Sequence, residues 1–502
     1  MLFRSVTDNP GRTAREAAVI LLDRELDEQF SVHTGYQYFI SGNLSRKHVD
    51  QIAGSVLANE LIESVTVFTR DEWMEVHRHE FPAPVVTAAD ERPNLYDEID
   101  LDVSDERLME ISREKMLALT LDEMKVIRDY YASQECRTYR AQHSLPRSPT
   151  SVELEILAQT WSEHCKHKIF AAQIEYREND GVPQRIDGLF KQFVRGTTEK
   201  VRANKGENDY CLSVFKDDAG IIRFDEDNGV AFKVETHNSP SALDPYGGAL
   251  TGIVGVNRDS FAAGMGGRLI ANTDVFCFAS PFHDEPLPPR ILHPKRVMEG
   301  VREGVEHGGN KSGIPTVNGC IVFDERFLGK PLVYCGTLSV VPMNVAGREG
   351  YEKQAMPGDH VIMVGGRIGK DGIHGATFSS EALHVGSPVT AVQIGDPITQ
   401  KRATDFLLRA RDAGLYNSMT DNGAGGLSSS VGEMARQTGG ATLHVDRAPL
   451  KYHGLEPWEI VVSESQERMT VAVRPDKVDT FLGLAREWNV EATDLGEYNE
   501  SG

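Results

Sequence analysis

The sequence lacks several features that would assign it to special classes of protein. Its six cysteines, at positions 136, 165, 211, 277, 320 and 335, include no Cys-x-x-Cys pair, so the usual spacing of zinc ligands is absent. Scattered single cysteines are typical of reduced thiols, and we expect a cytoplasmic protein. No run approaches the roughly 18 apolar residues of a membrane span, and the first eight residues lack the apolar core of a signal peptide. We therefore expect no membrane partner.

Positive charge is also scarce. Lys and Arg number 53 against 75 Asp and Glu, which gives a net charge of −22. A nucleic-acid binder needs a basic face, so we expect no nucleic-acid partner. The acidic surface serves solubility. It leaves a phosphorylated substrate open, because a few local cations or a bound metal ion reverse the field at a site.

The chain of 502 residues is long enough for two to four domains, and its patterns predict an α/β (α+β) fold in four zones. Residues 1–88 read as a small α+β module, with β-rich runs at 17–22, 36–40 and 65–68 around a helix between 45 and 61. Residues 89–150 are acidic and polar, and we interpret them as a linker domain with a helix near 121–131.

The other two zones, 151–350 and 351–502, are mixed α/β units. The first carries strand patterns at 232–236, 275–279, 320–323 and 333–341. The second has the continuous apolar run 360–364, typical of a strand buried on both faces, and a strand at 469–473. Its apolar periodicity predicts helices over 398–413 and 428–437.

One strand pattern places three chemically reactive side chains on a single face. Side chains alternate along a strand, so Lys233, Glu235 and His237 point to the same side. A carboxylate suits Mg²⁺, a lysine suits phosphate, and a histidine suits acid–base chemistry near neutral pH. An exposed polar strand face would show the same alternation, and spacing alone does not separate the two readings.

A second candidate lies in the segment 161–168, Trp-Ser-Glu-His-Cys-Lys-His-Lys. The helix before it begins with a capping box formed by Thr150 and Glu153. His164 follows Trp161 by three residues, so it shares the inward face at the helix end. Glu163, His164 and His167 suit a metal ion, whereas a histidine satisfied near a helix C-terminus is the simpler alternative.

Three more polar stretches suit phosphate, metal or substrate contacts. Arg258 and Asp259 follow the Gly-rich stretch 246–252, whose glycines would let backbone approach a ligand closely. Asp421 sits at a Gly-rich turn that leads into a helix, which is a natural corner for phosphate or metal. The run 463–468, Ser-Glu-Ser-Gln-Glu-Arg, lies between two apolar elements and is either loop polarity or a set of substrate contacts.

Two familiar nucleotide-binding motifs fail on spacing or context. In the stretch 304–312, an asparagine separates the second glycine from the lysine and breaks the P-loop pattern. The glycines at 264–267 do not follow a strand in a βαβ unit, which excludes a Rossmann site. ATP binding would therefore need a motif other than these two.

Taken together, these stretches closely resemble phosphoribosylformylglycinamidine synthase, the formylglycinamide ribonucleotide amidotransferase of purine biosynthesis. Residues 17–70 are similar to the family's small companion subunit. The resemblance implies an aminoimidazole-ribonucleotide-synthetase-like N-domain and C-domain, preceded by the small module and the linker. The matching stretches are 161–168, 233–241, 247–259, 393–397, 421–427 and 463–468.

The resemblance also implies roles, residue by residue. It makes His164 and His237 catalytic, without saying which acts as base, and it places ATP at His167 and Lys233. It assigns Mg²⁺ to Glu235, Asp259 and Asp421. It assigns the ribonucleotide to Thr236, Asn238, Ser239, Arg258, Gln393, Glu464, Ser465 and Gln466.

The implied activity is that of an ATP-dependent C–N ligase: ATP phosphorylates the amide oxygen of formylglycinamide ribonucleotide, and ammonia then displaces phosphate. Ser239 stands where many members have a second histidine, and His167 stands where small members often have tyrosine. No cysteine lies in a Gly-rich nucleophile elbow, so we expect a separate glutaminase to supply ammonia. Because the family continues with a second N-domain and C-domain, we expect an N-terminal half that needs the other half or a homodimer. The alternatives are a non-catalytic scaffold, or another ATP-using enzyme of the superfamily.

Overall fold

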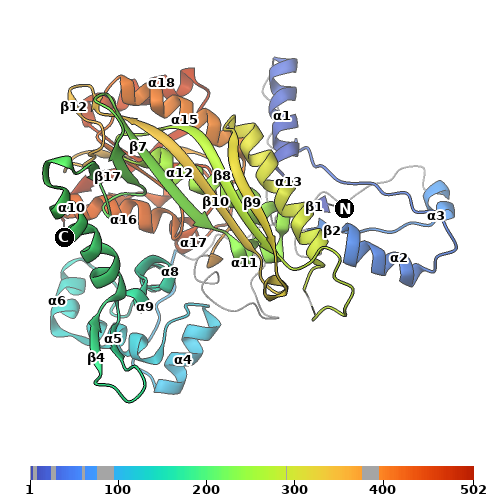
Figure 1. Ribbon diagram of the computed structural model, residues 1–502, viewed down its shortest axis with the longest axis horizontal. Coiled ribbons are helices and arrows are strands. Elements are labelled where there is room, and N and C mark those ends of the chain that lie inside the picture. The colour runs from blue at the N-terminus through green and yellow to red at the C-terminus, as the bar shows by residue number, and fades with distance from the viewer. Residues whose placement is uncertain are drawn as a thin grey trace.

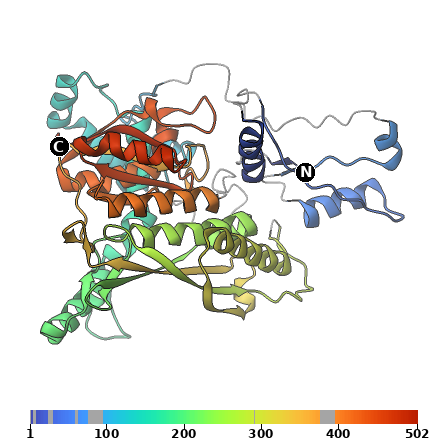
Figure 2. The same ribbon diagram turned by 90° about the horizontal axis from the view of Figure 1, so that it is seen from above.

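The computed structural model describes residues 2–3, 8–23, 30–58, 63–75, 95–289, 291–375 and 395–501. Figure 1 shows an N-terminal segment on one side, a group of short helices below, and two α/β units that form the body of the molecule. Figure 2 shows these two units stacked as separate layers, with helices of the first facing the second. Within the described ranges, no helix is long and apolar enough to cross a membrane.

The first α/β unit, called the N-domain here, is built on a six-stranded sheet in the order β5-β6-β7-β10-β8-β9. Neighbouring strands are antiparallel except for β8 and β9, which are parallel and joined by the crossover helix α13, Pro294–Ser312. The four expected strand patterns all form strands. The strands are β5 (Cys211–Ser213), β6 (Gly220–Arg223), β7 (Asn228–Thr236), β8 (Arg268–Phe278), β9 (Thr316–Phe323) and β10 (Leu332–Pro342).

Helices cover one face of this sheet. Helix α12, Pro245–Ala262, packs beside α13, and apolar side chains of both helices meet those of β8 and β10 in one core. Figure 2 shows this helical layer between the sheet and the second α/β unit. The edge strand β9 has no such cover, because all eight of its residues are exposed. Its apolar side chains include Val317, Ile321 and Phe323.

The second α/β unit, called the C-domain here, has a five-stranded antiparallel sheet in the order β14-β16-β13-β17-β15. Its central strand β13, His360–Gly365, is buried on both faces, as its continuous apolar run predicts. Val361 and Met363 join one core, whereas Ile362 and Val364 join the other. The other strands are β14 (Ser418–Asp421), β15 (Gly440–Leu443), β16 (Arg468–Val473) and β17 (Ala492–Asn499).

Helices lie on both faces of the C-domain sheet. Helices α15 (Pro397–Asp412) and α18 (Val478–Glu487) pack on one face, and α16 (Gly426–Thr438) and α17 (Pro457–Val462) pack on the other. Phe261 and Met265 of the N-domain pack into the core beneath α15 and α18. This shared core holds the two domains together, so a site between them has walls fixed by packing.

Short helices between residues 99 and 161 form a separate core. It contains Leu108, Met124 and Leu154, and Trp161 packs against it. The helices are α4 (Asp105–Glu114), α5 (Leu121–Ala132), α6 (Gln134–Gln142) and α7 (Ser151–Thr160). The predicted capping box of Thr150 and Glu153 forms at the start of α7. The expected boundary at residue 150 therefore falls inside this core.

The chain then leads into the N-domain through small elements. These are α8 (Glu163–Lys166), α9 (Lys168–Ala171), β3 (Gln173–Tyr176), β4 (Gln184–Asp187) and α10 (Gly196–Lys205). Helix α11, Asn238–Leu243, follows β7 directly. The pair β11 (Asn344–Val345) and β12 (Arg348–Glu349) precedes the C-domain.

The N-terminal segment differs from the expected β-rich module. Residues 17–22 belong to helix α1, Asn9–Leu22, because Asp8 caps its N-terminus and Pro10 occupies its first turn. Residues 36–40 and 65–68 form no strand. The expected helix begins correctly as α2, Arg46–Ile52, capped by Ser45. It continues as a π-helical segment, Ala53–Leu57, and the segment also contains α3 (Arg70–Glu75), β1 (Leu2–Phe3) and β2 (Glu63–Ser64).

Candidate active site between the two domains

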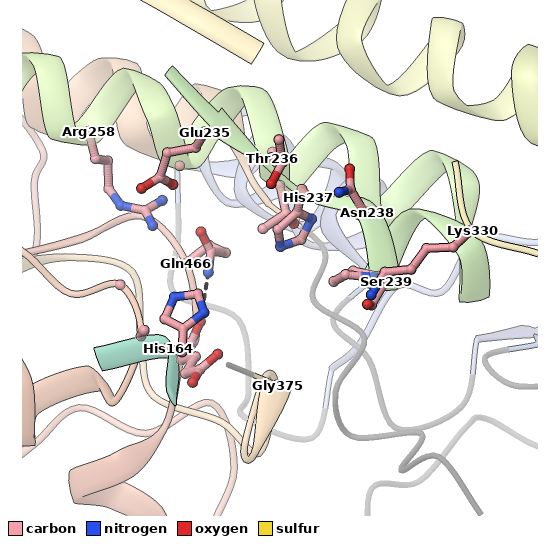
Figure 3. A pocket seen from close by; sticks show the side chains of 17 residues that line it. His164, Glu235, Thr236, His237, Asn238, Ser239, Arg258, Lys330, Gly375 and Gln466 are labelled. Atoms are coloured by element: carbon pink, nitrogen blue, oxygen red, sulfur yellow. Dashed lines mark hydrogen bonds between the residues drawn. The ribbon is translucent and has the colours of Figure 1, made fainter. Parts of the chain in front are cut away.

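A cavity of about 220 Å³ opens where the two domains and the segment after α7 meet (Figure 3). Its wall combines the end of β7 and helices α11 and α12 with α8 and two C-domain turns. Most of the side chains expected at a site meet here. The expected residues in the wall are His164, Glu235, Thr236, His237, Asn238, Ser239, Arg258, Glu464 and Gln466.

His237 lies at the end of β7, where the strand turns into α11. Its backbone N–H donates to Val333 O at 2.9 Å, which ties the turn to β10. Its Nδ1 donates to the carbonyl oxygen of Gly248, and because a carbonyl only accepts, the proton must sit on Nδ1. Burial lowers the pKa of His237 to about 4. The imidazole is therefore neutral at neutral pH, with Nε2 free of its proton and able to accept one.

The Gly-rich stretch that precedes Arg258 serves packing. It forms the first turns of α12, and Gly252 also lines the cavity. A Cβ at Gly248 would lie 2.4 Å from the backbone nitrogen of Ser241, and one at Gly252 would lie 3.0 Å from Cβ of His237. The absence of side chains thus lets α12 lie directly against the turn that carries His237.

A cluster of opposite charges lies behind the cavity wall. The Lys233 Nζ is 3.4 Å from Glu235 and 3.6 Å from Asp259. Burial lowers the pKa of Lys233, but the carboxylates of Asp259 and Glu235 outweigh this effect and hold that pKa above its usual value. The Arg258 Nε lies 3.3 Å from Asp421, so this second ion pair joins α12 of the N-domain to β14 of the C-domain.

The carboxylates of this cluster repel one another. Burial, followed by the charges of Glu235 and Asp421, raises the pKa of Asp259 well above its usual value. Burial also raises the pKa of Asp421 to about 6, with Arg258 opposing and Asp218 and Glu235 adding to the rise. Carboxylates that resist losing their protons mark a place where added positive charge is stabilising.

The three predicted Mg²⁺ ligands influence one another's pKa values, but they are not arranged as one set of metal ligands. Among the described residues, no group of three or more His, Cys, Asp or Glu side chains is placed to hold a metal ion. Lys233 contacts two of the three carboxylates. The donor chemistry fits Mg²⁺, which takes carboxylate oxygens, and the mutual repulsion of the carboxylates favours a cation among them.

His164 enters the cavity from the opposite side. Ser162 caps the short helix α8, which directs His164 toward β7. Desolvation by the surrounding chain lowers the pKa of His164 although its side chain is open to the cavity, and the charge of Glu235 opposes this effect. His167 ends α8 in the left-handed region, with φ of 51°, and lies outside the cavity wall.

The polar run 463–468 is buried: residues 463–467 form the loop between α17 and β16, and Arg468 begins β16. Glu464 and Gln466 line the cavity, and the side chain of Ser465 turns away to donate to Asp371 at 2.8 Å. The buried guanidinium of Arg468 donates to the carbonyl oxygens of Ser463 and Ser465 at 2.5 and 2.7 Å. Ser465 therefore shapes the loop, whereas its two neighbours face the cavity.

The remaining expected residues take other places. Lys233, Asp259 and Asp421 lie behind the wall, as described above, and Gln393 falls outside the described residues.

Sequence reasoning missed two groups. Lys330 lines the cavity from a Gly-Lys-Pro turn. Lys353 pairs with both Asp217 and Asp218, and Asp218 accepts from Thr420 next to Asp421. The tandem aspartates were visible in the sequence, but their lysine partner is far along the chain.

Three segments of the chain match known protein families. Residues 108–168 match the formylglycinamide ribonucleotide amidotransferase linker domain. Residues 216–341 match the N-terminal domain of AIR synthase related protein, and residues 356–502 match its C-terminal domain. These assignments agree with the short-helix core and the two α/β units.

Whole proteins give the same picture. The chain is 35% identical over 399 residues to phosphoribosylformylglycinamidine synthase subunit PurL of Thermoplasma acidophilum, covering 79% of this chain and 47% of that one. For the Salinibacter ruber PurL, identity is 36%, with 71% and 43% covered. The solved structure of Thermotoga maritima PurL complexed with FGAR matches with a TM-score of 0.56 and 31% identity, over 72% of this chain and 51% of that one.

The fold and the cavity between its domains thus define a protein of the AIR synthase related class. Within that class, the chain is a homologue of PurL, the phosphoribosylformylglycinamidine synthase subunit. It spans about half the length of the curated relatives it matches.

Proposed function

We propose that this chain supplies one half of an ATP-dependent synthase that converts formylglycinamide ribonucleotide and ammonia to formylglycinamidine ribonucleotide, ADP and phosphate. One observation carries the proposal: His164, His237, Glu235 and the 463–468 loop converge on a single cavity between two AIR synthase related domains. Solved PurL structures complexed with FGAR and with ATP share this fold.

The chemistry requires activation of an amide, because an amide carbonyl is a poor electrophile. Transfer of the γ-phosphoryl group of ATP to the amide oxygen releases ADP and converts that oxygen into a leaving group. Ammonia then adds to the carbon, the C–O bond breaks, phosphate leaves, and one proton is lost from nitrogen. The product is an amidine.

Two histidines face the cavity from opposite walls. The neutral His237, with Nε2 free of its proton, suits acceptance of the proton that ammonia loses. His164 also has a lowered pKa, and it would donate a hydrogen bond to the phosphorylated intermediate.

The charged cluster behind the wall suits phosphoryl transfer. Lys233 would stabilise charge on the transferring group. Glu235, Asp259 and Asp421 would hold Mg²⁺, which supplies charge neutralisation between ATP and the protein. His167 would contact ATP from the turn after α8, and Gln393 would contact the ribonucleotide.

The whole reaction needs partners. A separate glutaminase would supply ammonia. The solved structure of PurLQS from Thermotoga maritima, which matches this chain, supports partnership with other subunits. The exposed edge strand β9 would pair with or be covered by a second domain, either from the other half or from a second copy of this chain. The cytoplasmic location expected from the sequence stays a prediction.

The test is ammonia-dependent release of ADP with formylglycinamide ribonucleotide. It is run with this chain alone and with the separately expressed second half of a PurL subunit. We expect activity when the second half is present, and its loss in His237→Ala. Absence of activity in both cases, with both polypeptides folded and associated, would indicate a non-catalytic scaffold. Turnover on selenide or thiamine phosphate would indicate another enzyme of the superfamily.

A further inference from the structure

The N-terminal helix α1 contacts the C-domain at the start of α15. The guanidinium of Arg12 forms an ion pair with the carboxylate of Asp396, and its Nη2 donates to Thr399 Oγ1 at 3.0 Å. One turn further along both helices, Arg402 Nη1 lies 3.5 Å from a carboxylate oxygen of Glu16. Residues three or four apart share one face of a helix, so the two contacts place α1 along the first turns of α15.

The ion pair with Arg12 supports the cap of α15. Asp396 is the N-cap residue, and its carboxylate accepts from the backbone N–H groups of Ile398 and Thr399 at 3.0 and 3.3 Å. The Thr399 hydroxyl donates to the same carboxylate at 2.9 Å. Asp396 is buried, and a buried carboxylate is costly unless a positive charge is near. Arg12 supplies that charge, so it stabilises the first turn of α15 in its place.

The same turn of α15 holds two parts of the cavity wall. The backbone N–H of Asp396 donates to a carboxylate oxygen of Glu467, the residue that follows Gln466. Four residues along α15, the amide oxygen of Gln400 accepts from Arg258 Nη1 at 3.3 Å. Gln466 and Arg258 both line the cavity. A shift of this turn would therefore reach the cavity at two places.

Glu467 depends on being anchored in this way. Its φ of 60° is unfavourable for a residue with a side chain, and its side chain is buried. Burial raises the pKa of Glu467 to about 7. The positive charges that oppose this rise belong to Lys451, Arg258 and Arg12, so the charge of α1 reaches the loop. An anchored Glu467 in turn fixes the direction of Gln466.

We propose that Arg12 is a positioning residue for the loop 463–467, and that α1 acts through α15 to shape the cavity wall. That this loop contacts the ribonucleotide rests on the proposed function. Arg12 is not one of the residues that line the cavity, and it acts through Asp396 and Glu467. The N-terminal segment, which lies outside the three family matches, thereby gains a role in ribonucleotide recognition.

Hydrogen–deuterium exchange of the full chain tests the link without any ligand. We expect Arg12→Ala to speed exchange of residues 463–467 by about three- to tenfold, which is within the range for coupling through packed contacts. Exchange in the central strand β13 should stay unchanged. Arg12→Lys keeps the positive charge and should lie nearer to the wild type than to Arg12→Ala. Arg46→Ala is the matched control, since Arg46 pairs with Asp50 inside α2 of the same N-terminal segment.

Calorimetric titration of the full chain then tests whether the link serves substrate binding. We expect Arg12→Ala to weaken binding of formylglycinamide ribonucleotide by about three- to tenfold and to leave the affinity for ADP unchanged. Arg46→Ala should change neither affinity. A general loss of structure in Arg12→Ala would lower both affinities and speed exchange in β13, and that result would overturn the proposal.

Two other results would also overturn it. One is equal exchange of residues 463–467 in the wild type and in Arg12→Ala. The other is faster exchange there with an unchanged affinity for the ribonucleotide. Failure of the proposed function looks different, because the wild type would then bind no ribonucleotide. Faster exchange confined to residues 463–467 in Arg12→Ala would in that case still show that α1 positions the loop.

Discussion

The Nε2 atom of His374 lies 2.9 Å from a carboxylate oxygen of Glu155, and both side chains are buried. Glu155 belongs to α7, the helix that leads to His164. His374 precedes Gly375, which lines the cavity. The imidazole also stacks on Trp458, with ring centroids 6.0 Å apart. This pair therefore ties two pieces of the cavity wall from distant parts of the chain.

Removing this link should be costly. His374 has a φ of 63°, which is unfavourable for a residue with a side chain, and its Nδ1 has no hydrogen-bond partner in the described part of the chain. We expect Glu155→Ala to lower the free energy of unfolding by about 2–4 kcal/mol, since a buried imidazole loses its partner. Glu155→Gln keeps an acceptor and should lose less than half as much. Equal loss in both variants, measured by urea denaturation, would contradict the hydrogen-bond role.

The pH dependence of stability should report the charged cluster. The pKa of Asp421 is raised to about 6 in the folded protein, above the value of about 3.9 expected when unfolded. A raised pKa means that the group stabilises the fold when protonated, so this contribution is present below about pH 4 and is lost as pH rises through about 6.

Asp421→Asn should flatten that part of the profile. We expect it to reduce the stability lost between pH 4 and pH 7 by about 1–3 kcal/mol, since the amide oxygen still accepts from Arg258 and carries no charge. Urea denaturation across this range, without divalent cations, measures the effect. An unchanged slope would show that the folded protein does not raise the pKa of Asp421. Added Mg²⁺ should stabilise the wild type more than the variant if the cluster holds the metal.

Close packing of α12 against the turn that carries His237 is testable with two glycines. Gly248→Ala places a Cβ 2.4 Å from a backbone nitrogen, so we expect a loss of about 2–4 kcal/mol and weaker ribonucleotide binding. Gly432, on α16, has open space around the added atom. Gly432→Ala should raise stability by about 0.5–1 kcal/mol, because alanine is the better helix former. A Gly248→Ala variant as stable as the wild type would disprove the tight contact.

The exposed β9 strand predicts self-association when the second half is absent. Val317 is 65% exposed on an edge strand, where unpaired backbone groups are open to another chain. We expect dimers at tens of micromolar by light scattering, and monomers for Val317→Lys. Val182→Lys is the control, since Val182 is 86% exposed and lies outside the main sheet. A wild type that stays monomeric at this concentration, or a control that dissociates equally, would count against β9 as the interface.

Local patterns predicted much of the fold correctly. The strands around His237 and the buried strand β13 follow from alternation and from continuous apolar runs. The helices α5, α7 and α15 follow from caps and from the 3.6-residue period. The prediction of a strand over residues 17–22 was wrong. It rested on apolar content alone and did not consider the capping Asp8 and the proline near it. The glycines of α12 were expected to let backbone approach a ligand, and Gly252 lines the cavity. Their second role, close packing against the turn that carries His237, has no local signal in the sequence.

The sequence alone determined which side chains share the face of β7, since the two-residue period of a strand is a local property of the backbone. It also determined the two-domain organisation, through the order of the apolar runs. Only the tertiary structure decided that Lys233 would lie among carboxylates from both domains, that Ser465 would turn from the cavity, and that Lys330 would enter it. These outcomes depend on how distant segments pack, and packing sets burial, distance and therefore charge.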